Sequence, residues 1–152
     1  MRKILIILLI LISLNSYSQR KEQWIKLGMF TTSIALNAVG DGLNTAGNKD
    51  LGHLCNALSI GVTLSIPLII DIKKDEWYWY LLEYSFIRFA TFDYIYNLSA
   101  GNEWSYYGNS HKYDQFFGGQ NKYGLAIMKG TVLMIGISIN FQKTKKTGET
   151  AP

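Results

Sequence analysis

The sequence is short of cysteine, proline and charge. Cys55 is the only cysteine, which excludes a disulfide within the chain and any metal site built from several cysteines. The chain has two prolines, and charged residues make up 17% of its 152 residues. Soluble domains carry about 25% charged residues. This shortfall in charge, together with 48% hydrophobic residues, is typical of a membrane protein.

Signatures of known chemistry are also lacking. The chain has no HExxH or Glu-x-x-His metal motif, no G-x-S-x-G nucleophile motif and no glycine-rich phosphate loop. The aromatic residues of the loop at 100–122 lack the interleaved basic residues that binding of single-stranded nucleic acid would require. The sequence therefore specifies neither a reaction nor a substrate, and we expect no nucleic-acid partner.

The N-terminus has the pattern of a secretory signal peptide. Arg2 and Lys3 precede an apolar run at residues 4–14, and small residues stand before a cleavage point that follows Ser18. A retained anchor helix is the alternative, but eleven apolar residues are fewer than the roughly 20 that span hydrocarbon. We expect a signal peptide at 1–18, a single helical membrane domain at 19–142 and a flexible polar tail at 143–152.

Four apolar segments follow the signal peptide, and we expect each to form a helix. They cover residues 27–47, 51–71, 77–97 and 123–141. The predicted fold is all-α, a small helical membrane bundle of three or four hydrophobic helices in the bacterial cell envelope, with the inner membrane favoured over the outer. The distribution of basic residues favours three spans over four, with residues 27–47 lying in the interface or re-entering on the outer side without crossing. The lipid bilayer is the expected partner in either case.

A small outer-membrane β-barrel is the alternative fold. Residues 60–66 and 135–141 alternate apolar and small or polar side chains, and the second stretch ends in Phe141, as closing strands of such barrels do. Residues 77–97 are longer than the roughly ten that a barrel strand needs. The helical bundle is therefore preferred.

Polar side chains gather toward one end of the predicted bundle. Successive antiparallel helices bring together the end of the first, the start of the second, the end of the third and the start of the fourth. Carboxylates, an imidazole and amide oxygens suit a divalent metal ion, which is the candidate cofactor. The metal set is Asp41, His53 and Asp93. The wider polar cluster adds Asn44, Asn56 and Asn97. Hydrogen bonds that only hold helices together are the alternative to a site.

Three charged residues occupy apolar segments and must be paired there. Glu83 and Arg88 lie five residues apart on one helix and face different ways, so we expect no pair between them. Lys129 is expected to pair with Asp93 or with Glu83. These residues indicate either an ion or proton pathway or a structural ion pair.

The loop at residues 100–122 is long, aromatic and rich in glycine, so we expect no helix in it. Loops of this length in small proteins are commonly functional. It is the candidate surface for a protein partner or a second copy of the chain. Two hypotheses of function follow. One is an exported integral membrane protein with a structural or binding role. The other is a membrane-embedded, metal-dependent hydrolase that acts on lipid or another amphiphile.

Overall fold

The computed structural model describes residues 21–70, 72, 76–107 and 112–142, so the expected signal peptide and tail lie outside the described part of the chain. The described residues form helices and contain no strand. The helices are α2 (Lys21–Thr45), α3 (Lys49–Ile69), α4 (Trp77–Ser99), α5 (Lys112–Gly118) and α6 (Lys122–Gln142). The predicted all-α fold is confirmed.

The β-barrel alternative is wrong. Residues 60–66 lie inside α3 and residues 135–141 inside α6. Alternation over a few residues does not distinguish a strand from one side of an apolar helix, and only the length of the surrounding segment does so. By length and composition, two of the described helices, α3 and α6, are able to cross a membrane.

Two expectations about helix limits need correction. Residues 21–26 are the first turns of α2, whereas the sequence placed the helix start at residue 27. The loop expected to lack helix contains α5, a short helix whose Phe117 packs on Phe89 of α4, with ring centroids 5.9 Å apart. Burial of that ring against α4 outweighs the low helix propensity of the glycines that follow it.

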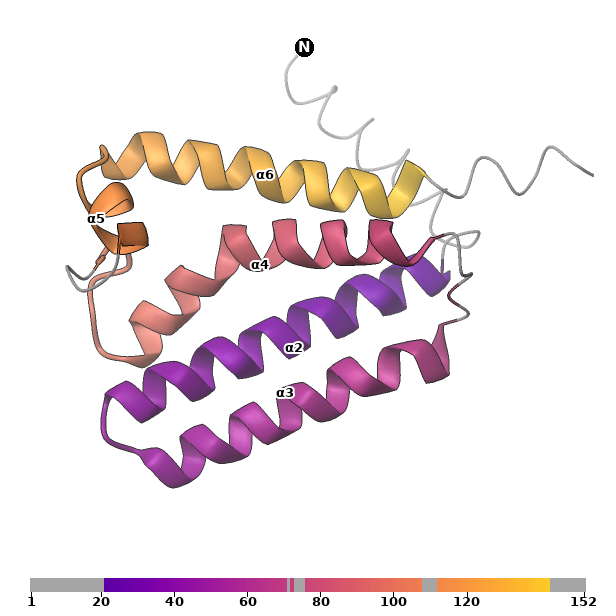
Figure 1. The fold of residues 1–152 in the computed structure, drawn as a ribbon, viewed down its shortest axis with the longest axis horizontal. Helices are drawn as coiled ribbons and strands as arrows, with labels where there is room; N and C mark the ends of the chain where they lie inside the picture. Colours follow the sequence, from indigo (N-terminus) through magenta and orange to yellow (C-terminus); the bar gives the residue numbers. More distant parts are fainter. Residues whose placement is uncertain (1–20, 71, 73–75, 108–111, 143–152) are drawn as a thin grey trace, which may run out of the picture.

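The four long helices lie side by side in the order α3, α2, α4, α6 (Figure 1). α2 packs against α3 on one side and α4 on the other, while α6 packs mainly against α4. α3 and α6 run opposite to α2 and α4, so α2 and α4 are parallel neighbours. The turn between α2 and α3 and the segment that contains α5 lie at the same end, which we call the loop end. The predicted gathering of polar segments at one end is thus present.

The α2–α3 contact depends on glycine. A Cβ atom on Gly40 would lie 2.2 Å from Oδ1 of Asn56, and one on Gly52 would lie 2.1 Å from Oδ1 of Asn44. Gly40 and Asn44 are four residues apart on α2, as Gly52 and Asn56 are on α3, so the two antiparallel helices exchange the same glycine–asparagine contact. Small residues let helix backbones approach closely and let polar side chains bond across the contact, as in membrane bundles.

The interior is small and partly polar. The main apolar cluster consists of Phe30, Ile34, Ile66, Ile70 and Ile87. Partly buried apolar side chains pack against it. Buried polar or charged residues among those described include Lys26, Glu83, Asn97, Lys129 and Asn140. Large apolar side chains cover the outside: among others, Leu68 is 85% exposed, Ile127 72% and Leu64 66%. Polar groups inside and apolar groups outside reverse the usual arrangement of a soluble domain.

Candidate functional site

A chain of hydrogen bonds joins the three helices α2, α3 and α4 at mid-length. Nη1 of Arg88 donates to Oδ1 of Asn37 at 2.6 Å, and Nδ2 of Asn37 donates to Oδ1 of Asn56 at 3.1 Å. Nδ2 of Asn56 then donates to Oδ1 of Asp41 at 2.8 Å. A cation stands at one end and an anion at the other, and each amide is oriented by the bond before it. We call this set the amide relay.

Lys129 lies in a closed aromatic cage beside Asp93. The lysine side chain is 0% exposed, and its Nζ lies 2.5 Å from Oδ2 of Asp93. The centroids of the Phe89, Tyr94 and Tyr107 rings are 5.0–5.6 Å from that Nζ, within cation–π range. The Tyr107 hydroxyl donates to the same Asp93 oxygen at 3.3 Å. Of the two pairings expected for Lys129, the structure has the one with Asp93.

Glu83 pairs instead with Lys26, near the other end of the bundle. Nζ of Lys26 is 2.7 Å from Oε2 of Glu83, and both side chains are almost fully buried, at 8% and 2% exposed. The Tyr80 ring lies 4.5 Å from the same Nζ. Three residues before Lys26, the backbone oxygen of Gln23 accepts a hydrogen bond of 3.0 Å from Nδ2 of Asn140 in α6. This bond ties α6 to α2.

Asn97 fixes the described start of the 100–122 loop. Its Nδ2 donates to the backbone oxygens of Trp104 and Tyr106, at 3.2 and 2.8 Å. Trp104 also packs on Tyr94 of α4. The loop therefore folds back over α4 and brings Tyr107 to the Lys129 cage.

The structure divides the predicted polar cluster. Asp41 and Asn56 belong to the amide relay, Asn44 packs on the α2–α3 contact with its buried Oδ1 atom unbonded, and Asn97 holds the loop. His53 is exposed on α3.

The metal set is not assembled. Within the described residues, no three His, Cys, Asp or Glu side chains are placed to hold a metal ion, so Asp41, His53 and Asp93 do not form a metal site there. Asp41 bonds to Asn56 of α3, whereas Asp93 bonds to Lys129 of α6. A shared end of the bundle does not bring side chains on different helices within bonding distance.

Several residues of these clusters were not expected from the sequence. Lys26 precedes the helix start at residue 27 that the sequence predicts, and Asn140 is not among the predicted site residues. Lys26, Phe30, Ser33, Asn37, Gly40 and Asn44 follow one another at alternating steps of four and three. That spacing marks one side of a helix and is the signal in the sequence that would have extended the predicted helix to Lys26.

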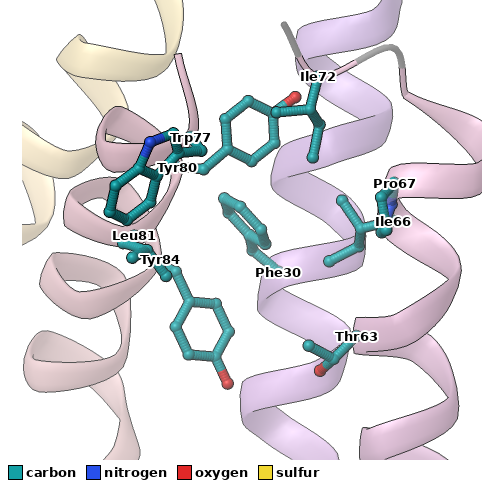
Figure 2. A pocket seen from close by; sticks show the side chains of 9 residues that line it. All are labelled: Phe30, Thr63, Ile66, Pro67, Ile72, Trp77, Tyr80, Leu81 and Tyr84. Atoms are coloured by element: carbon teal, nitrogen blue, oxygen red, sulfur yellow. The ribbon is translucent and has the colours of Figure 1, made fainter. Parts of the chain in front are cut away.

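An apolar groove lies between α3 and α4, over α2 (Figure 2). It has a volume of about 340 Å³ and is lined by Phe30, Thr63, Ile66, Pro67, Ile72, Trp77, Tyr80, Leu81 and Tyr84. Figure 2 shows the Phe30 ring on the floor and the side chains of the two flanking helices as walls, with the hydroxyl groups of Tyr84 and Thr63 at the end away from Trp77. We call it the aromatic groove.

A second hollow follows further along α4. It has a volume of about 240 Å³ and is lined by Ser85, Arg88, Phe89, Phe92 and Asp93. The Arg88 guanidinium lies 4.1 Å from the centroid of the Phe92 ring. Among the described residues Arg88 forms no salt bridge, and its hydrogen-bond acceptor is the neutral amide of Asn37.

The fold and these clusters define an all-α protein with a polar interior, an apolar exterior and a groove between helices. Comparisons with protein-family models, with curated proteins and with solved structures found no match.

Proposed function

We propose that this chain is a small exported integral membrane protein that binds an amphiphile in the aromatic groove, and that its buried polar groups hold the helices in register. One observation supports the membrane assignment above the others: the apolar helices are on the outside. α3 and α6 are at the edges of the row, and only 17% and 22% of their most apolar stretches is buried. The core helix of a soluble protein would be mostly buried.

Helix length supports the same proposal. α3 and α6 have 21 residues each, so each is about 30 Å long, which is the thickness of the hydrocarbon layer. Contiguous exposed apolar surface on this scale is costly in water and marks contact with lipid or with another protein.

All four long helices are proposed to span the membrane. α2 has 25 residues and lies between α3 and α4, so it is not placed like a helix that rests in the interface. The buried ammonium groups of Lys26 and Lys129 are neutralised inside the protein by Glu83 and Asp93. Paired charges that face the bundle interior are the form in which ionisable side chains occur in membranes.

The hydrolase hypothesis is not carried further, because it relied on the metal set of Asp41, His53 and Asp93. Binding of a protein partner or a second copy by the loop stays a prediction. The first half of the loop is proposed to have a structural role, because the hydrogen bonds of Asn97 and Tyr107 hold that half against α4.

Cysteine labelling in intact membranes tests the membrane assignment. In a Cys55→Ser background, single cysteines replace Leu58, at mid-length of α3 and 51% exposed, and Asn48, in the turn before it. We expect a water-soluble maleimide to label Asn48→Cys in opened vesicles and to leave Leu58→Cys unlabelled until SDS is added. Equal labelling of both, or release of the chain by carbonate washing, would refute the proposal.

A further inference from the structure

We propose that the amphiphile is a long-chain carboxylic acid, with its carboxylate at Arg88 and its chain in the aromatic groove. This inference adds the ligand class to the proposed function and rests on it. It depends on three features of the described residues: the position of Arg88 relative to the groove, its lack of a carboxylate partner, and the largely apolar lining of the groove.

Arg88 continues the row of α4 side chains that line the groove. Trp77, Leu81, Tyr84 and Arg88 are separated by four, three and four residues, so they lie along one side of the helix. Arg88 comes one turn after Tyr84, about 6 Å further along the axis. On α2, the residue bonded to Arg88 is Asn37, two turns beyond the groove-lining Phe30.

The charge of Arg88 has no direct counter-charge in the described part of the chain. Asp93, which lines the same hollow, is bonded to Lys129, and Asp41 is reached only through the two amides of the relay. A guanidinium has five N–H donors, whereas Arg88 makes one hydrogen bond there and contacts one ring. Among the described residues that line the hollow, Arg88 carries a positive charge and Asp93 a negative charge, and the ammonium of Lys129 is bonded to Asp93. An anion with two coplanar oxygens matches this guanidinium.

The groove complements an apolar chain that starts at this anion. Figure 2 shows the hydroxyl groups of Tyr84 and Thr63 at the end away from Trp77 and the hydroxyl group of Tyr80 beside Ile72 at the opposite end, so polar atoms lie at both ends of the groove and apolar side chains line its middle. A single acyl chain fits the apolar middle of the groove. The hollow at Arg88 adds Ser85 as a hydroxyl group beside the expected carboxylate.

The depth of Arg88 favours a free acid over a phospholipid. Arg88 is eleven residues from Trp77 on a helix of 23 residues, so it lies about 16 Å along the helix and close to its middle. Phospholipid headgroups lie in the interfacial layer outside the hydrocarbon. A carboxylate on one chain is small enough for a hollow of about 240 Å³, whereas a phosphodiester with two chains would have to leave that layer.

Quenching of tryptophan fluorescence tests the proposal on the full chain in a nonionic detergent. The probes are a brominated long-chain acid, which quenches by contact, and unlabelled dodecanoate, dodecanol, acetate and phosphatidylglycerol as competitors. We expect saturable quenching that Trp77→Phe largely removes. Dodecanoate should compete at least about tenfold better than dodecanol, since a hydrogen bond to a charged group contributes at least that factor. Acetate should compete weakly.

Substitutions separate the head from the tail. Arg88→Gln should weaken binding of the brominated acid about tenfold or more, with Arg88→Lys intermediate, and Leu81→Trp should weaken acid and alcohol alike by filling the groove. Lys122→Gln removes an exposed cation, whose side chain is 48% exposed, and should leave binding unchanged. Equal competition by dodecanol and dodecanoate on the wild type refutes recognition of the carboxylate, whether or not Arg88→Gln folds. Competition by phosphatidylglycerol as strong as that by dodecanoate also refutes the proposal. Failure of the cysteine-labelling test would overturn the membrane assignment without altering these binding results.

Discussion

The buried Lys26–Glu83 pair gives the sharpest test of the polar interior. Replacing Lys26 by Met keeps most of the volume of the side chain and removes its charge, which leaves the Glu83 carboxylate buried without the ammonium now 2.7 Å away. The chain offers a matched control, because Lys122 and Glu103 form a second Lys–Glu pair, 3.6 Å apart, on side chains that are 48% and 64% exposed. The two pairs share their chemistry and differ in burial.

The expected magnitudes differ accordingly. Breaking a buried ion pair by removing one partner costs about 3–5 kcal/mol, because the remaining charge is desolvated and uncompensated. Lys26→Met and Glu83→Gln should each fall in that range. The double variant should cost much less than the sum of the two, since it leaves no unpaired charge. Lys122→Met, at the exposed pair, should change stability by about 1 kcal/mol or less.

Unfolding in mixed micelles with increasing SDS, followed by far-ultraviolet circular dichroism, measures these differences. Each variant is compared with the wild type in the same detergent. If Lys26→Met lowers the free energy of unfolding by less than about 1 kcal/mol, as expected for the exposed pair, water reaches Lys26 and Glu83. The account of α2 and α4 as helices with a dry polar contact would then be wrong.

Three further substitutions test the helix contact and the loop. Gly40→Ala should be destabilising, because its Cβ would lie 2.2 Å from Oδ1 of Asn56 and 2.8 Å from the backbone oxygen of Gly52, so α2 and α3 must separate. Gly61→Ala, with nothing within 4 Å, should instead stabilise α3 by about 0.5–1 kcal/mol in the same SDS unfolding assay. Asn97→Ala removes two hydrogen bonds to loop carbonyls and should speed proteolysis of the loop, with little change in helix content. Unchanged cleavage would contradict the proposed role of Asn97.

The sequence predicted the helices well because their signal is local. A start at Trp77 and the gathering of polar segments at one end agree with the structure, since apolar length and turn residues determine them. The separation of Glu83 from Arg88 follows from helix geometry alone, and the structure gives each a different partner.

Side-chain partners were harder to predict, because they depend on which helices are neighbours. Asp41, His53 and Asp93 were grouped by their shared end, but α2 bonds to α3 through Asp41, and α4 bonds to α6 through Asp93. The predicted helix begins after Lys26, because residues 20–26 include four charged side chains and charged side chains are usually solvated. Two features of the sequence would have indicated that Lys26 is buried. Lys26 belongs to the series of α2 residues spaced alternately by four and three, and Glu83 needs a cationic partner if Lys129 pairs with Asp93.

Some polar groups that hold the helices together also belong to the proposed binding site, whereas the sequence presented these two roles as alternatives. The bonds Asn37–Arg88 and Thr45–Tyr96 join α2 to α4 across the same separation of 51 residues, so they hold the two parallel helices in one register over about 12 Å. Apolar packing alone would tolerate a slip of one turn, whereas a slip here would break both bonds. The same register places Arg88 one turn beyond the aromatic groove, whose floor is α2 and whose walls are α3 and α4. The amide relay that stabilises the row of helices therefore also orients the guanidinium that we propose as the recognition group.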